Sequence, residues 1–92
     1  MAYQFEWDPA KAITNLRKHG VSFDEAMTVF DDSRRIHSLD PDHSIHEQRY
    51  LLLGMSNQQR VLAVSYTERL PRIRIISARP GDRDERGKHA KG

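Results

Sequence analysis

The chain has 92 residues, of which 37% are hydrophobic and 30% charged, and its formal net charge is +2. This length suits one core, so we expect a single domain over residues 1–92, and the lack of cysteine excludes a disulfide scaffold, a Cys-ligated zinc site and a Cys nucleophile. No apolar run approaches the roughly 18 residues of a membrane-spanning helix and no signal-peptide pattern follows Met1, so we expect a soluble, cytoplasmic protein without membrane contact.

The first elements are a short strand and a helix. Residues 3–7 alternate aromatic and polar side chains, which is the period of a half-buried strand. Asp8 and Pro9 then have the chemistry of an N-cap and a first helical position, and Gly20 can adopt the left-handed conformation that ends a helix. We expect the apolar side of this helix to consist of Ala10, Ala12, Ile13 and Leu16.

A second helix is predicted to begin after Ser22, because Ser22 and Glu25 have the spacing of a capping box. An apolar stripe at helical spacing follows on this helix: Phe23, Ala26, Met27 and Phe30. We interpret the stripe as core rather than as a ligand groove.

After Asp32 the pattern changes to that of strands. They are expected at residues 35–39, 49–55, 60–66 and 72–78, with separators short enough for hairpins. The fold class is therefore α+β, with a short N-terminal strand, two helices and a four-stranded antiparallel meander. The helices should pack on one sheet face and leave the other free, and the charged tail forms at most a short helix over residues 82–89.

The net charge conceals a division along the chain. Residues 1–33 carry three Lys or Arg against six Asp or Glu, a net of −3, whereas residues 34–92 carry twelve against seven, a net of +5. Ten of those twelve cations are Arg, whose planar guanidinium binds phosphate through two hydrogen bonds. The second half therefore suggests an anionic partner, although an Arg-rich solvated surface without a ligand is the plainer alternative.

Polar residues recur at alternate positions along the predicted strands, where they would share the free sheet face. They are Glu47 and Arg49, then Ser65, Thr67 and Arg69, then Ser77 and Arg79. Guanidinium groups stabilise the charge of a phosphorane-like transition state, and a carboxylate or imidazole can move the proton of a ribose 2′-OH without a metal. The alternative is an ordinary solvent face with cross-strand ion pairs.

Lys18 and His19 end the first predicted helix, where cations complement the helix dipole. Either they are only a basic last turn before Gly20, or His19 is a general acid or base and Lys18 contacts a phosphate.

Residues 40–47 contain His, Asp and Glu side chains that are legitimate metal ligands. His43 and His46 are three residues apart in a predicted loop, which matches no recognised zinc spacing. We therefore expect a polar hairpin loop, with no metal and no cofactor.

The order of these features resembles the BrnT family, which consists of ribonuclease toxins of type II toxin-antitoxin systems. The resemblance covers residues 5–86. In the first half it depends on Phe5-Glu6-Trp7-Asp8, Asn15, Lys18-His19-Gly20, Phe23, Ala26 and Phe30-Asp31-Asp32. In the second half it depends on Glu47-x-Arg49, Gly54, Tyr66-Thr67-Glu68-Arg69, Arg74-Ile75-Ile76-Ser77-Ala78-Arg79 and Glu85-Arg86.

The resemblance implies a RelE-like fold and metal-independent cleavage of RNA. It also implies a BrnA-like antitoxin as partner, in a heterotetramer or larger complex that reaches DNA only through the antitoxin. The residues it points to for catalysis are His19, Glu47, Arg49, Arg69 and Arg79. The residues expected to bind RNA are Lys18, Thr67, Arg74, Ser77 and His89, and His89 is a departure from the family pattern.

Within these sets the sequence leaves two candidates each for the general base and the general acid. The base is Glu47 or His19, and the acid is His19 or His89, which stands where relatives often have a Tyr. The rival function is a small basic module that binds a partner protein or nucleic acid without cutting it. Growth arrest on expression without the partner would distinguish a toxic nuclease from such a module.

Overall fold

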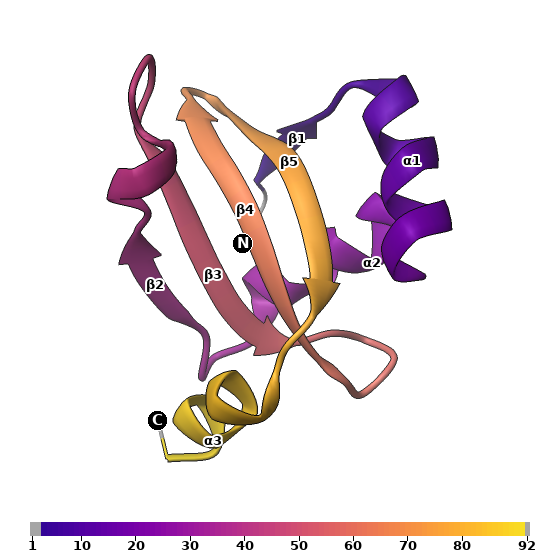
Figure 1. Cartoon of the computed structure of the whole chain (residues 1–92), viewed down its shortest axis with the longest axis vertical. Helices are drawn as coiled ribbons and strands as arrows, with labels where there is room; N and C mark the ends of the chain where they lie inside the picture. The colour runs from indigo at the N-terminus through magenta and orange to yellow at the C-terminus, as the bar shows by residue number, and fades with distance from the viewer. Residues whose placement is uncertain (1–2, 92) are drawn as a thin grey trace.

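The structure is a computed structural model that describes residues 3–91, and the sheet within them has the strand order β1-β5-β4-β3-β2 (Figure 1). The strands are β1 (Gln4–Glu6), β2 (Ile36–Leu39), β3 (Arg49–Met55), β4 (Val61–Arg69) and β5 (Arg72–Pro80). Strands β2 to β5 form the predicted antiparallel meander. Strand β1 instead runs parallel to β5, so the sheet is mixed rather than purely antiparallel.

The helices begin and end as their capping residues indicate. They are α1 (Pro9–His19), α2 (Phe23–Thr28) and α3 (Arg83–Lys91), with short 3-10 turns η1 (Val29–Asp31) and η2 (Pro41–His43). The Asp8 carboxylate accepts a hydrogen bond from the N–H of Ala10 at 2.9 Å, and Gly20 ends α1 with a φ of 70°. Among residues 3–91, no helix is both long and apolar enough to cross a membrane.

One face of the sheet is covered by α2 and η1, which carry the predicted stripe into the core. Phe23, Ala26, Val29 and Phe30 are all buried there against side chains of β3, β4 and β5. Gly54 of β3 allows the close approach of η1, because a Cβ at this position would lie 2.7 Å from a methyl carbon of Val29. The interpretation of the stripe as core is confirmed for Phe23, Ala26 and Phe30, while Met27 is partly buried and packs against the same core.

A buried carboxylate on the same side of the sheet forms an ion pair with an arginine that is 38% exposed. Glu25 is only 2% exposed in its side chain, and Arg60 donates to its two oxygens at 2.6 and 2.8 Å. The Ser56 hydroxyl donates a third hydrogen bond at 2.7 Å. The hydrogen bonds from Arg60 and then Ser56 outweigh the effect of burial, so the pKa of Glu25 lies below its ordinary value.

The expected apolar side of α1 was wrong for Ala10, Ile13 and Leu16, which are exposed, and right for Ala12, which is partly buried against the core. Ile13 and Leu16 are 60% and 51% exposed, and the buried residue of α1 is Asn15. The Asn15 amide donates to the carbonyl oxygens of Val21 and Ala78 at 2.9 and 2.8 Å, and its oxygen accepts from the N–H of Ala78 at 3.0 Å. Because the β1 pairing ends at residue 74, Asn15 satisfies the β5 edge that would otherwise be unpaired.

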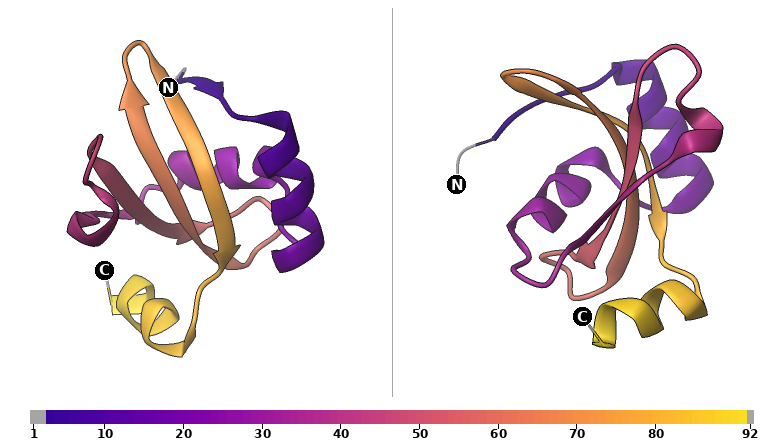
Figure 2. Two further views of the ribbon diagram at one scale, coloured as in Figure 1. Left: turned by 45° about the horizontal axis from the view of Figure 1, so that its top comes forward. Right: turned by 90° about the vertical axis from the view of Figure 1, so that its left-hand side faces the viewer.

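The opposite sheet face, called the open face below, is only partly free. Figure 2 shows α3 on the side of the sheet away from α2, and α3 contacts β3 and β4. Leu53 and Ala63 point to this face by strand parity, yet they are 6% and 2% exposed. The expectation of a fully free face is therefore corrected, because the tail helix folds back over one end of it.

Helix α3 is held near its end by hydrogen bonds to the segment before β2. The imidazole of His89 lies 2.7 Å from the Asp32 carboxylate, and the Arg34 guanidinium donates to the carbonyl oxygen of Ala90 at 2.8 Å. Burial alone would raise the pKa of Asp32, but hydrogen bonds from the N–H groups of Met55 and Arg34, and from His89, outweigh burial and lower it.

Candidate functional site

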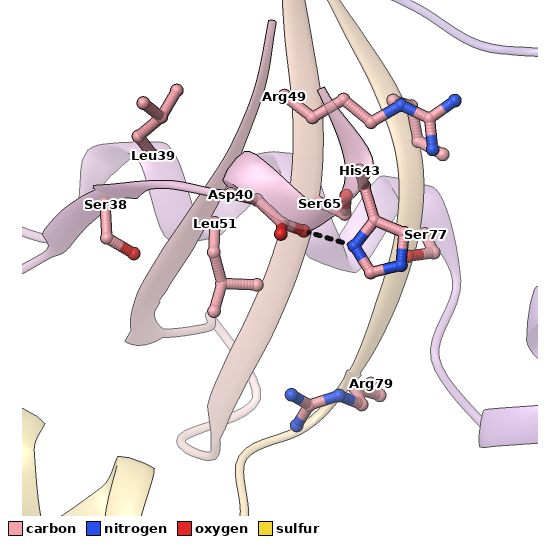
Figure 3. A pocket seen from close by; sticks show the side chains of 10 residues that line it. Ser38, Leu39, Asp40, His43, Arg49, Leu51, Ser65, Ser77 and Arg79 are labelled. Atoms are coloured by element: carbon pink, nitrogen blue, oxygen red, sulfur yellow. Dashed lines mark hydrogen bonds and ion pairs between the residues drawn. The ribbon is translucent and has the colours of Figure 1, made fainter. Parts of the chain in front are cut away.

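Three neighbouring hollows that share lining residues are together called the open-face groove. The central hollow, of about 350 Å³, lies over β3, β4 and β5 (Figure 3). The α1 hollow, of about 300 Å³, lies between α1 and β5 and shares Ile76 and Ser77 with the central hollow. The loop hollow, of about 480 Å³, is bordered by residues 42–47 and shares His43 and Arg49 with it. The groove therefore runs from α1 across the sheet to the loop before β3.

Arg49 occupies the centre of this groove. It stands at the start of β3, opposite Thr67, and lines both the central and the loop hollows. Within residues 3–91 the guanidinium forms no ion pair, and its buried Nε atom has no hydrogen-bond partner. A guanidinium without an internal partner is suited to bind an external anion such as a phosphate.

Arg79 also lines the central hollow, but its guanidinium is paired within the protein. Its guanidinium forms two hydrogen bonds with the Glu85 carboxylate of α3, at 2.6 and 3.0 Å. The hydrogen bonds from Arg79 are the main reason that the pKa of Glu85 lies below its ordinary value. The charge of Arg79 is thus partly neutralised within the protein, whereas that of Arg49 is not.

The α1 hollow contains the basic end of α1. Lys11, Lys18 and His19 line it together with the Ser77 hydroxyl of β5. The structure therefore brings the Lys18-His19 pair and Ser77 to one place, although they are far apart in the sequence. The pair also keeps its local role, because Arg17, Lys18 and His19 form the basic last turn of α1.

The loop hollow contains Glu47 and Arg69, which form an ion pair at 3.4 Å. Arg69 also lies 4.0 Å from Glu6 of β1, and Glu6 has two further arginine partners, Arg74 at 2.8 Å and Arg72 at 3.8 Å. Three guanidinium groups therefore meet two carboxylates, Glu6 and Glu47, at this end of the open face, which leaves one positive charge in excess among these five side chains.

Three residues expected to bind RNA lie outside the lining of the groove. Thr67 is 2% exposed and donates its hydroxyl to the carbonyl oxygen of Gln48 at 2.6 Å. Arg74 is held by Glu6, and His89 is buried against Asp32. The groove is lined by the other seven of the ten residues predicted for catalysis or RNA binding: Lys18, His19, Glu47, Arg49, Arg69, Ser77 and Arg79.

One histidine of the groove, His43, was not predicted to be a site residue from the sequence. His43 was considered only as a metal ligand, and within residues 3–91 no group of three or more potential ligands is arranged to hold a metal ion. Its Nδ1 atom lies 2.9 Å from the Asp40 carboxylate, at the mouth of the central hollow (Figure 3). The signal was the spacing: Pro41 begins a 3-10 turn, in which side chains at i and i+3 are aligned.

Comparison with known proteins identifies the family. The model of the family described as "Ribonuclease toxin, BrnT, of type II toxin-antitoxin system" matches residues 7–85, which is most of the chain. The chain belongs to the BrnT family. This family implies an RNA substrate and an antitoxin partner.

A solved BrnT structure has the same fold. It is the 1.1 Å crystal structure of the ribonuclease toxin BrnT of Brucella abortus, which is 21% identical in sequence, with a TM-score of 0.65. The match covers 89% of this chain and all of the Brucella chain. A search of curated proteins found no match. At this identity the Brucella structure supports the fold, and the site must be argued from the residues of the groove.

Proposed function

We propose that this BrnT family member is a metal-independent endoribonuclease whose RNA substrate lies along the open-face groove. The observation that carries the proposal is Arg49, an unpaired guanidinium at the junction of two hollows. Cations also line the rest of the groove, with Lys11 and Lys18 at one end and Arg69 at the other. Such a row suits consecutive phosphates of a single strand.

The chemistry proposed is attack of a ribose 2′-OH on the adjacent phosphodiester. Arg49 binds the phosphate oxygens and stabilises the charge that develops on them, supported by Arg79 and Arg69. Glu47 and His19 remain the acid–base candidates that the sequence identified, and both line the groove.

The remaining predicted residues receive different roles. Lys18 and Ser77 line the groove and are proposed to contact RNA directly. Thr67, Arg74 and His89 are engaged within the protein, so we assign them to supporting the groove.

The proposed partner is a BrnA-like antitoxin, in a heterotetramer or larger complex that contacts DNA only through the antitoxin. The open-face groove carries the positive charge that an acidic segment of such a partner would neutralise. Because the substrate is RNA, we propose that the toxin acts in the cytoplasm.

The deciding experiment is an assay of the purified protein on RNA in excess chelator. Cleavage that is insensitive to chelator is expected. If cleavage appears only when a divalent ion is added back, the metal-independent mechanism fails.

The alternative, a binding module that does not cut RNA, predicts a different result in cells. Expression without the antitoxin should arrest growth for the wild type and not for Arg49→Ala. The matched control is Arg83→Ala, which removes an exposed arginine of α3 outside the groove and should still arrest growth. If cells that express the wild-type protein continue to grow, and the purified protein leaves RNA intact, the binding module is favoured.

A further inference from the structure

The loop before β3 holds one histidine in a defined position beside Arg49. Asp40 and Arg49 close the base of the loop, because the N–H of Asp40 donates to the carbonyl oxygen of Arg49 at 2.8 Å. The N–H of Arg49 in turn donates to the Ser44 hydroxyl at 2.9 Å. Between these anchors, η2 brings the side chains of Asp40 and His43 together. The loop is therefore tied to the strand that carries the unpaired guanidinium.

The imidazole of His43 has one nitrogen engaged and one available. Its Nδ1 atom lies 2.9 Å from the Asp40 carboxylate, which is an acceptor and so favours the tautomer with the proton on Nδ1. Within residues 3–91 the Nε2 atom has no hydrogen-bond partner, and the side chain is 66% exposed. His43 lines the central hollow together with Arg49, Ser77 and Arg79, and the view of Figure 3 draws its ring between the two arginines. A lone pair on Nε2 therefore faces the groove.

We propose that His43 is the catalytic base of RNA cleavage and that Asp40 is its positioning residue; the inference rests on the proposed function. The Nε2 atom takes the proton of the 2′-OH, and the 2′ oxygen forms a bond to phosphorus while Arg49 binds the phosphate. The bond from phosphorus to the 5′ oxygen breaks, which leaves a 2′,3′-cyclic phosphate and a 5′-hydroxyl end. The departing 5′ oxygen takes a proton from water, and His43 later returns its own proton to water.

The other candidates are less favourably placed for this role. Glu47 is already paired with Arg69 at 3.4 Å. His19 lines only the α1 hollow, whereas His43 shares two hollows with Arg49. His89 is 5% exposed and held by Asp32. Of these groups, only His43 combines an aligned carboxylate, an open nitrogen and the neighbourhood of an unpaired guanidinium.

The test compares His43→Ala with the wild type on a short RNA in chelator. The expected loss in kcat is about 100-fold to 10,000-fold, the range for removal of a general base. Affinity for the same RNA with 2′-O-methyl groups, which cannot be cleaved, should stay within about twofold because the ring is not expected to bind phosphate. Added imidazole should restore part of the lost kcat, since the exposed site leaves room for it.

Asp40→Asn tests the positioning role. An asparagine amide can donate to Nδ1 and so favour the wrong tautomer, hence kcat should fall at least about tenfold while KM changes little. The matched control is Asp84→Asn, which removes an exposed carboxylate of α3 and should cleave as the wild type does.

The outcomes separate this inference from the function on which it rests. If the wild type leaves RNA uncut, the proposed function fails. If the wild type produces cyclic phosphate ends and His43→Ala retains its kcat, only the role of His43 is overturned. A folded, RNA-binding His43→Ala whose lost activity imidazole does not restore overturns that role as well.

Discussion

Polar groups at two places in the molecule, the covered side of the sheet and the open-face groove, differ in whether they have partners within the protein. On the side covered by α2, Glu25 has three hydrogen-bond donors, and the amide of Asn15 at the neighbouring edge of β5 is fully paired. On the open face, the Arg49 guanidinium forms no ion pair within residues 3–91, and the Nε2 atom of His43 has no hydrogen-bond partner there. Polar groups that are satisfied within the protein stabilise the fold, and those left unsatisfied are available to a ligand. The comparison predicts that substitutions on one side reduce stability and on the other reduce activity.

The largest effect is expected from Arg60→Ala on the covered side. The substitution leaves the Glu25 carboxylate, which is 2% exposed, without its charged partner, so the free energy of unfolding should fall by about 3 kcal/mol or more at pH 7. Urea denaturation followed by Trp7 fluorescence measures this, because Trp7 packs on Phe23 in the core. Arg83→Ala is the control and should change stability by no more than about 0.5 kcal/mol.

The reverse pattern is expected for Arg49→Ala on the open face. Loss of one charge-stabilising group should lower the rate of RNA cleavage by about 100-fold, while the urea midpoint stays near that of the wild type. Arg79→Ala should lower the rate less, because Glu85 already neutralises part of its charge. A larger effect on stability than on cleavage for Arg49→Ala would contradict the division between the two sides.

Asn15→Leu tests whether the β5 edge needs its amide. The substitution leaves the N–H and C=O of Ala78 and the C=O of Val21 without their partner, so stability should fall by about 2 kcal/mol. Hydrogen exchange of the Ala78 amide should also become faster. An unchanged exchange rate would show that another group covers this edge.

Acid should weaken the covered side through its carboxylates. The folded-state pKa of Glu25 lies below the ordinary value of 4.5, so its stabilising effect is present above that pH and is lost as the pH falls toward the lowered pKa. The stability difference between the wild type and Arg60→Ala should therefore narrow when denaturation is repeated below about pH 4. A constant difference across this range would mean that the pair contributes through packing rather than charge.

The smallest effect is expected from Ile13→Ser. Ile13 is 60% exposed, so the free energy of unfolding should change by no more than about 0.5 kcal/mol in urea denaturation. A loss of about 2 kcal/mol would instead restore the sequence-based expectation that Ile13 faces the core.

The elements could be predicted because their signals are local. Asp8, Gly20 and Ser22 act within one helical turn of themselves, and the structure confirms the helix boundaries they indicate. The meander could also be predicted, since its turns are short and apolar and polar side chains alternate along much of its strands. The excess of Arg in the second half also indicated an anionic partner before any site was known.

The errors came from contacts between distant segments. The apolar residues of α1 predicted its buried side, but the amide of Asn15 was the better partner for the β5 edge beyond β1. Likewise, the charged tail folds over the open face because His89 meets Asp32, which is 57 positions earlier. Hydrophobic periodicity shows neither the burial of Asn15 nor the docking of the C-terminal helix. Each depends on which backbone group or charged side chain of a distant segment lacks a partner.

By itself the sequence determined the α+β class, the order of the strands in the meander and the helix caps, since capping and alternation act locally. Its excess of Arg in the second half only suggested an anionic partner. Only the tertiary structure decided which polar groups meet. It paired Arg79 with Glu85, left Arg49 unpaired and aligned His43 with Asp40 at the same groove. Whether a charge is neutralised inside a protein depends on distances of a few ångströms between segments that the sequence keeps apart.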